Sequence, residues 1–130
     1  MDDLQQEIDA KATAPRITPA DIEANIASEH YFTADQGVSG AYIDAAGPSG
    51  TVRVECPLSL TLLTFCVLTL RNGFTVTGES ACASPENFDA VIGRKVARAN
   101  AIEKMWPLMG YELKSRLHQI EQLRAQVGAA

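Results

Sequence analysis

The chain has 130 residues, which suffices for one domain with one hydrophobic core. Hydrophobic residues make up 46% and charged residues 21%, so a wholly disordered chain is excluded. The net charge of −5 argues against duplex nucleic acid as a partner, because a protein that binds a duplex needs several uncompensated cations. A small anionic ligand is not excluded, since a local basic patch can hold it.

The charge is unevenly distributed along the chain. Residues 1–55 contain ten acidic and three basic residues, a net charge of −7. The segment 86–130 contains seven basic and five acidic residues, a net charge of +2. We therefore expect any anion site to lie in the second half.

The cysteines and histidines show no metal-ligand spacing. Cys56, Cys66 and Cys82 form no CxxC pair, and an odd number of cysteines does not suit a disulfide framework. We predict that Cys66 and Cys82 are not bonded to each other, as a reducing cytosol would favour. His30 and His118 add no zinc pattern, so neither a metal nor a cofactor is expected.

The sequence shows neither a targeting segment nor a membrane span. Residues 1–11 lack the basic and apolar stretches of a signal peptide. The longest apolar-rich run, residues 58–70, is interrupted by four serine and threonine residues and is too short to cross a bilayer as a helix. We therefore expect a cytoplasmic protein with no membrane partner.

The N-terminal part divides into a tail and a helix. Residues 1–16 are polar and acidic, and we interpret them as a flexible tail or a frayed helix. Residues 17–130 are expected to form a single α+β domain that binds a ligand. Thr18 as the cap and Pro19 at the first helical position predict a helix over about 19–30.

A glycine-rich stretch follows. Residues 33–51 are predicted to be a loop, because glycine and proline punctuate them. Residues 51–55 alternate weakly and predict a short strand that ends before Pro57.

The strongest local signal is a β-hairpin at residues 60–80. Asn72 and Gly73 separate two β-prone runs, as in a two-residue type I′ turn, which needs a positive φ angle at both residues. Such a turn pairs Thr69 with Val76.

This register leaves an apolar surface on one strand of the hairpin. Leu68 and Leu70 would lie on the same face as Thr75 and Thr77, an apolar run beside a polar one. We therefore expect the N-terminal helix or a second subunit to cover the two leucines. The mismatch predicts a homo-oligomer.

The C-terminal segment shows an apolar stripe at helical spacing. Ser84 followed by Pro85 predicts the helix start, and Pro107 is expected to kink or break the helix. We predict one helix near 86–105 and another from about 107 to 125, and leave a nearly continuous helix open. The stripe consists of Phe88, Ile92, Val96, Ala99, Ile102, Trp106, Met109, Leu113, Leu117 and Ile120.

One stretch is similar to a nucleophile motif. Residues 78–82, GESAC, lie between a strand and a helix, as in a nucleophile elbow, but Cys82 replaces the last glycine. A hydrolase also needs a base within hydrogen-bond reach, and neither histidine is evidently paired with Ser80. We interpret Gly78 as a bulge or a close backbone approach, and no catalytic residue is predicted.

Basic side chains gather on the first part of the long helix. A solvated face is the ordinary interpretation, but guanidinium groups also bind phosphate in a bidentate manner. Asn100 offers a donor and an acceptor to a ribose or base edge, and Phe88 can stack on a purine. Lys114 and Arg116 would arrive from the helix continuation or from a partner chain. The predicted ligand-binding residues are Phe88, Arg94, Arg98, Asn100, Lys104, Lys114 and Arg116.

Residues 63–117 contain a string of motifs that resembles the small phage proteins of the gp-forty-nine-like family. The resemblance extends over about residues 17–118 and breaks at 33–57. Its motifs are Arg71-Asn72-Gly73-Phe74, Gly78-Glu79-Ser80-Ala81-Cys82, Asn87-Phe88-Asp89, Ile92-Gly93, Trp106-Pro107-Leu108 and Gly110-Tyr111.

The resemblance implies a non-enzymatic binding function. The family includes the Thoeris anti-defence proteins, which sequester cyclic ADP-ribose-type signals, and related members bind cyclic oligonucleotides. This chain would bind such a small cyclic nucleotide uncleaved, as a homodimer or hexamer in the cytoplasm of the infected bacterium. The alternatives are a phage structural or host-protein interaction module and, third, a hydrolase of the same signal.

The expected fold is α+β. A small antiparallel sheet around the 60–80 hairpin would pack against an N-terminal helix and a long C-terminal helical segment.

Overall fold

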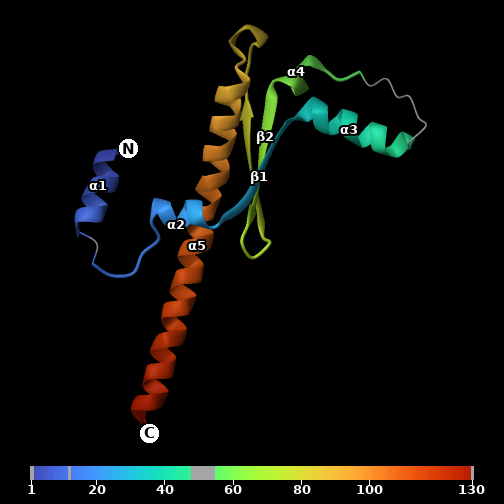
Figure 1. Cartoon of the computed structure of the whole chain (residues 1–130). Helices are drawn as coiled ribbons and strands as arrows, with labels where there is room; N and C mark the ends of the chain where they lie inside the picture. The colour runs from blue at the N-terminus through green and yellow to red at the C-terminus, as the bar shows by residue number, and fades with distance from the viewer. Residues whose placement is uncertain (1, 12, 48–54, 130) are drawn as a thin grey trace.

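The computed structural model describes residues 2–11, 13–47 and 55–129. Three strands form one antiparallel sheet in the order β1-β2-β3, and a long helix follows them (Figure 1). This confirms the predicted α+β fold. The elements are α1 (Asp2–Lys11), α2 (Pro19–Ala24), β1 (Ile26–Thr33), α3 (Ala34–Ala46), α4 (Leu58–Thr61), β2 (Leu63–Leu70), β3 (Thr75–Ala81), the 3₁₀ turn η1 (Pro85–Asn87) and α5 (Ala90–Ala129).

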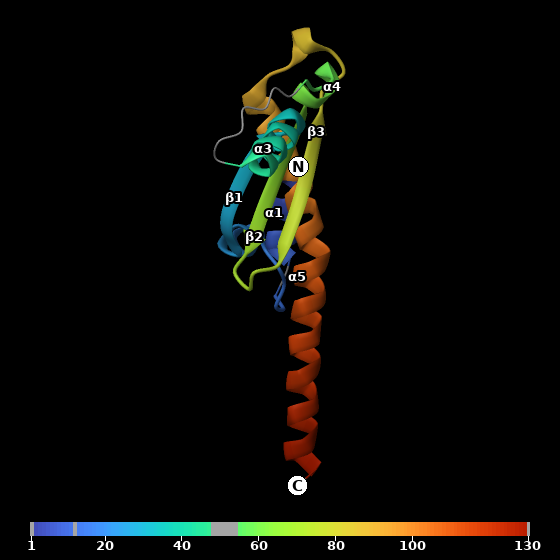
Figure 2. The same cartoon turned by 90° about the vertical axis from the view of Figure 1, so that its right-hand side faces the viewer.

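The long helix covers one face of the sheet. In Figure 1, α5 lies along the sheet and continues well past the end of the β2–β3 hairpin, while α3 stands on the other side. Figure 2 looks onto that other face, where α3 crosses only one end of the strands. The core therefore lies between α5 and the sheet.

A close approach of two backbones sets this packing. Gly78 on β3 lies against α5 so tightly that a Cβ built on it would sit 2.1 Å from the Ala97 carbonyl oxygen and 2.3 Å from the Ala101 nitrogen. Glycine is the residue that permits such contact. The close approach expected at Gly78 is thus confirmed.

The face of α5 that packs on the sheet carries glycine and alanine first and Met105 after them. Gly93, Ala97, Ala101 and Met105 are buried and recur every four residues, one above the other along the helix. In the first half of α5, the apolar stripe predicted from the sequence lies on a different face of the helix. Ile92, which belongs to this stripe, is 59% exposed. The predicted stripe follows the larger apolar side chains. The first half of α5 lies so close to the sheet that glycine and alanine occupy the contact instead.

The hairpin turn contains three residues rather than two. The Gly73 amide donates to the Leu70 carbonyl oxygen at 2.9 Å, and the Leu70 amide donates to the Phe74 carbonyl oxygen at 2.8 Å. Gly73 has a φ angle of +89°, whereas no described residue other than glycine has a positive φ. The predicted type I′ turn, with a positive φ at Asn72 as well, was therefore wrong.

The register differs from the prediction by one residue as a result. Thr69 pairs with Thr75, and Leu68 pairs with Val76. A shift of one residue moves every side chain of β3 to the other face, so the buried leucines of β2 now face Val76. The mismatch that predicted a second subunit does not exist.

The two leucines are covered from within the chain. Leu68 and Leu70 share the core with Ala97, Ala101 and Met105 of α5, and α2 adds Ile22. The C-terminal helix is thus their main cover, and the cover expected from the N-terminal helix is confirmed in part by Ile22. A homo-oligomer stays a prediction.

The N-terminal helix is shorter than predicted. The Asp21 amide donates to the Thr18 hydroxyl and the Thr18 amide to the Asp21 carboxylate, so the predicted start at Pro19 is confirmed. The helix ends at Ala24, however, and residues 26–33 form β1. These residues pair with β2. The backbone hydrogen bonds gained at the edge of β2 outweigh the local preference for a helix.

The predicted loop at residues 33–51 contains a helix. The amide of Thr33 donates to the Gln36 side chain at 2.9 Å and starts α3, in which alanine is frequent. Gly37 lies against the Phe32 ring, where an added Cβ would be 3.3 Å away, so this glycine serves packing rather than a turn. The strand predicted at residues 51–55 lies almost wholly outside the described residues.

The C-terminal segment forms one continuous helix. The Asp89 carboxylate accepts the amides of Val91 and Ile92, so α5 begins after Asp89, while Ser84 and Pro85 start only η1. Pro107 lies inside α5 and does not end it. Proline has no amide hydrogen, so the Glu103 carbonyl lacks its usual partner at position 107. Both residues are exposed, and water can therefore hydrogen-bond to this carbonyl.

Replacement of Gly78 tests the backbone contact. We expect Gly78→Ala to lower the free energy of unfolding in urea by more than ~3 kcal/mol, because the methyl group would collide with backbone atoms of α5. The matched control is Gly110→Ala on α5, where an added Cβ meets nothing within 4 Å. That variant should be neutral or more stable by ~0.5–1 kcal/mol. Equal stability of the two variants would contradict the packing described.

Candidate functional site

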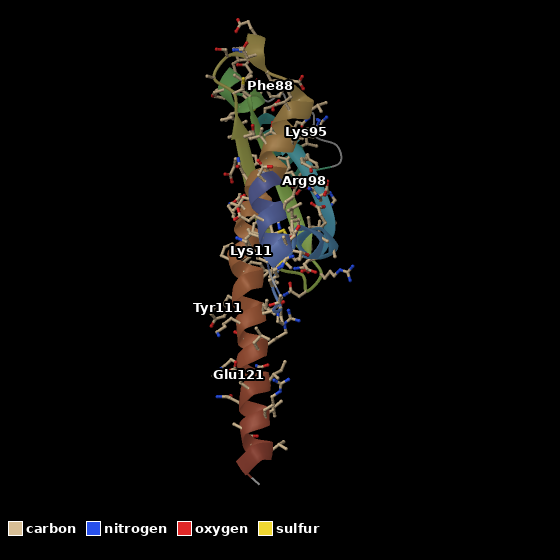
Figure 3. All side chains as sticks on the ribbon, turned by 90° about the vertical axis from the view of Figure 1, so that its left-hand side faces the viewer. Lys11, Phe88, Lys95, Arg98, Tyr111 and Glu121 are labelled. Carbon is tan, nitrogen blue, oxygen red and sulfur yellow. The ribbon has the colours of Figure 1, made fainter. Side chains whose placement is uncertain are left out.

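The predicted ligand-binding residues do not form one site within a chain. At 1.5 Å per residue, Arg94 and Arg116 lie about 33 Å apart along α5. Figure 3 shows Phe88 near the start of the helix and Arg98 further along, with Tyr111 on the part beyond the sheet. One small ligand cannot contact both ends, so the predicted set divides into separate groups.

Arg98 is engaged within the chain. Its guanidinium donates to both carboxylate oxygens of Glu23, at 2.7 and 3.0 Å, and its Nε donates to Glu29 at 3.1 Å. These hydrogen bonds raise the pKa of Arg98 further and lower the pKa of Glu23. Because two carboxylates lie beside this guanidinium, they would repel a phosphate group. The Arg98 contact instead connects α5 to α2 and β1.

Asn100 is also used within the fold. Its Nδ2 donates to the backbone oxygen of Glu79 at 2.7 Å and thereby connects α5 to β3. One of the two donors of the Asn100 side-chain amide, which was expected to reach a ribose or base, is therefore engaged within the fold.

Phe88 lies in a small cavity at the start of α5. The half-buried ring borders a space of about 170 Å³ together with Leu62, Ser80, Cys82 and Gly93. The basic side chains of Arg94, Lys104 and Lys114 are exposed and do not line this cavity. Phe88 thus has a cavity beside it but no cation in its lining.

A different cavity brings three arginines together. Arg16 from the segment before α2, Arg71 from the hairpin turn and Arg116 from α5 line a space of about 310 Å³, which we call the arginine cavity. Its lining also contains apolar side chains, among them Ile17 and Met109. Of the predicted ligand-binding residues, only Arg116 lies here.

The arginines keep donor groups available. Arg71 uses its Nε for the Ala24 carbonyl oxygen, which leaves the two terminal nitrogens. Arg116 is 3.7 Å from Glu112 on an exposed helix surface, a weak pair that a ligand can replace. Arg16 pairs with Asp9 at 2.8 Å.

One carboxylate belongs to the lining of this cavity. Asp21 accepts the Thr18 amide, and this hydrogen bond lowers the pKa of its carboxyl group. Asp21 is therefore committed to the cap of α2. The lining thus contains three guanidinium groups and one carboxylate, and the carboxylates of Asp9 and Glu112, which pair with Arg16 and Arg116, offset part of this positive charge.

Arg16 and Arg71 were not among the predicted ligand-binding residues. Both lie outside the basic segment 86–130, and Arg16 follows an acidic segment. The only local signal was the turn sequence around Arg71, which fixes that residue at the end of a hairpin. Proximity of three residues so far apart in sequence arises from the tertiary fold alone.

The buried polar groups do not suit nucleophilic chemistry. Cys66 is fully buried, and burial raises the pKa of its thiol, which disfavours the reactive thiolate. The Tyr31 hydroxyl donates to Glu29 at 3.0 Å, and burial raises its pKa. Ser80 is a strand residue paired with Thr64, so it does not sit on an elbow.

The three cysteines form no disulfide with one another. Cys56, Cys66 and Cys82 are free thiols, which confirms that Cys66 and Cys82 are not bonded. Within residues 2–11, 13–47 and 55–129, no three histidine, cysteine or acidic side chains gather as a metal site would require. No helix in these same ranges has an apolar stretch long enough to traverse a bilayer.

The chain matches the model of a known protein family. Residues 17–117 match the model of a family described as phage protein (N4 Gp49/phage Sf6 gene 66). No curated protein and no solved structure matches the chain.

The Arg98 contact predicts a pH dependence of stability. The hydrogen bond with Arg98 lowers the pKa of Glu23 in the folded state from its ordinary value of 4.5. The contribution of this ion pair to stability is therefore present above pH 4.5 and is lost as the pH falls through the folded pKa. We expect the free energy of unfolding to fall between about pH 5 and pH 3 by ~1 kcal/mol more in the wild type than in Glu23→Gln. Urea denaturation at several pH values measures the difference.

The control for this experiment is Glu86→Gln. Glu86 is exposed in η1 and lies outside the Arg98 contact, so this variant should keep the wild-type pH profile. Identical profiles for the wild type and Glu23→Gln would show that the ion pair adds nothing to stability.

Proposed function

The chain belongs to the phage protein (N4 Gp49/phage Sf6 gene 66) family, and from this premise we propose that it is an anti-defence protein. It binds a cyclic nucleotide immune signal of the cyclic ADP-ribose type, or a cyclic oligonucleotide, and holds it uncleaved. It acts without a cofactor in the cytoplasm of the infected bacterium, where such a signal is made.

The observation that carries the proposal is the arginine cavity. Arg16, Arg71 and Arg116 come from three separate segments and line one space of about 310 Å³. Guanidinium groups bind phosphate oxygens through paired, charge-assisted hydrogen bonds. The volume lies at the lower end of the range for small-molecule sites, which suits the phosphate part of a nucleotide.

The lining of the arginine cavity supports binding without turnover. Its described residues include no serine, cysteine, histidine, lysine or tyrosine, and its one carboxylate, Asp21, is held in the cap of α2. A hydrolase of the bound signal needs a nucleophile or a general base within reach of the phosphates or the ribose. The lining supplies neither group, and the neighbouring carboxylates of Asp9 and Glu112 are paired with Arg16 and Arg116, which supports a sequestering protein over the hydrolase considered from the sequence.

We also propose that the protein acts as a homodimer or hexamer. Several apolar side chains of α5 are exposed in one chain, among them Ile92, Val96, Leu123 and Val127. Exposed apolar side chains that recur along one helix are typical of a surface that meets a partner. A second chain could bring Arg94, Lys104 or Phe88 towards a ligand that they cannot share with Arg116 in one chain.

The second candidate is a phage structural or host-protein interaction module with no small-molecule ligand. The part of α5 beyond the sheet favours it, because this helical segment is unsupported by the rest of the chain and carries exposed Leu123 and Val127 (Figure 1). The arginine cavity has no role in that function, so the experiment below separates the two.

A retention experiment tests the proposal. The protein is incubated with cyclic ADP-ribose isomers made by a TIR enzyme and filtered, and the retained fraction is heated and identified by mass spectrometry. We expect the wild type to retain the signal and release it intact. Release of hydrolysis products would indicate an enzyme, and failure to retain any signal would favour the interaction module.

Arg116→Gln locates the binding in the cavity. A charge-assisted hydrogen bond to phosphate contributes ~1.5–3 kcal/mol, so this variant should bind about ten- to a hundredfold more weakly. The control is Arg124→Gln, an exposed arginine further along the same helix and outside the cavity, which should bind as the wild type does. Equal affinities of the two variants would exclude the arginine cavity.

A further inference from the structure

The first helix of the chain carries a strong negative charge. It contains four acidic residues and one lysine, a net charge of −3, and we call α1 the acidic arm. Figure 1 shows α1 apart from the sheet, on the side of α5 where α2 lies. Its apolar side chains, Leu4 and Ile8, are exposed and do not belong to the core. Apolar packing therefore holds the acidic arm only weakly to the rest of the chain.

One carboxylate of the acidic arm reaches the arginine cavity. The Arg16 guanidinium donates to the Asp9 carboxylate at 2.8 Å, and Arg16 lines this cavity. The Arg16 side chain is 29% exposed, compared with 60% for Arg116. Carboxylate and phosphate oxygens accept from the same donors of a guanidinium group. Asp9 therefore occupies a donor that an anion in the cavity would use.

The acidic arm can leave this position at a small cost. A helix of ten residues is marginal in water unless tertiary packing supports it, and α1 has little such packing. The Asp9 carboxylate also accepts the Gln5 side chain at 3.0 Å, so it keeps a partner within the arm when Arg16 is released. An ion pair as exposed as that of Asp9 with Arg16 adds little to stability. The docked and released positions of the arm therefore differ little in free energy, and an anion can shift the balance.

We propose that the acidic arm is an intramolecular competitor of the anion that binds in the arginine cavity. In the docked state the Asp9 carboxylate holds the Arg16 guanidinium, and in the released state a phosphate group takes its place. The inference rests on the proposed function and adds a regulation of the same site. A ligand with several phosphate charges displaces the carboxylate more readily than a singly charged anion, so the arm excludes weaker anions.

Calorimetry with inorganic pyrophosphate tests the competition. The titration is made at about 0.15 M salt, where charges more than about 8 Å apart are largely screened. We expect Asp9→Ala to bind pyrophosphate about three- to fivefold more tightly than the wild type, because the competing carboxylate is gone.

The matched control is Asp3→Ala. Asp3 lies in the same helix, is exposed and forms no ion pair with a described residue. Its replacement changes the net charge by the same amount as Asp9→Ala, and the variant should bind pyrophosphate as the wild type does. Equal affinities of the two variants would overturn the proposal.

A double variant shows whether the effect passes through Arg16. In Arg16→Gln the competing ion pair is absent, so the further change Asp9→Ala should leave the affinity for pyrophosphate unchanged. A gain of the same size with and without Arg16 would reveal a general effect of charge and would overturn the proposal.

Failure of this inference can be distinguished from failure of the proposed function. Retention of the cyclic signal by the wild type, together with equal affinities of all the arm variants, overturns the competitor and leaves sequestration standing. Tighter binding of pyrophosphate by Asp9→Ala alone, without retention of the cyclic signal, leaves the competitor standing and overturns the proposed function. Absence of pyrophosphate binding by both the wild type and Asp9→Ala overturns the competitor, because the cavity then holds no anion.

Discussion

The backbone contact between β3 and α5 determines where the rest of the molecule lies. Gly78 leaves no room between the strand and the backbone at Ala97 and Ala101. Because α5 is one continuous helix, this contact also fixes its later turns, which carry Met109 and Arg116. Those turns pass the end of the hairpin, where the arginine cavity forms. A side chain at position 78 would displace the helix and separate the groups that line this cavity.

Polar contacts then attach the N-terminal segment to this frame. Arg98 holds Glu23 of α2 and Glu29 of β1, while the Arg71 side chain donates to the Ala24 carbonyl oxygen. The charged residue that the sequence favoured as a phosphate ligand thus helps to place α2. This placement brings Arg16, just before α2, into the same cavity as Arg116. Arg98 thus helps to place α2, whereas Arg71 both attaches α2 and lines the cavity.

Much of the fold follows from local signals, but the site does not. The cap at Thr18, the hairpin around Gly73 and the long C-terminal helix could be predicted because each depends on neighbouring residues. The register was missed because a turn of three residues and a turn of two have similar sequences, and α3 was missed because glycine marked it as a loop. The cavity residues come from three distant segments, and no periodicity or spacing links Arg16 to Arg116 in a single sequence.

Hydrogen–deuterium exchange with bound cyclic ADP-ribose tests the location of the site most directly. The account predicts slower exchange of backbone amides at the end of α2 and in the hairpin turn, in peptides that contain Asn25 and Arg71–Phe74, because the ligand would rest on these segments. Exchange near Phe88 and Arg94 should not change within one chain. Protection confined to residues 86–100, with the hairpin turn unaffected, would contradict the account and return the site to the first half of α5.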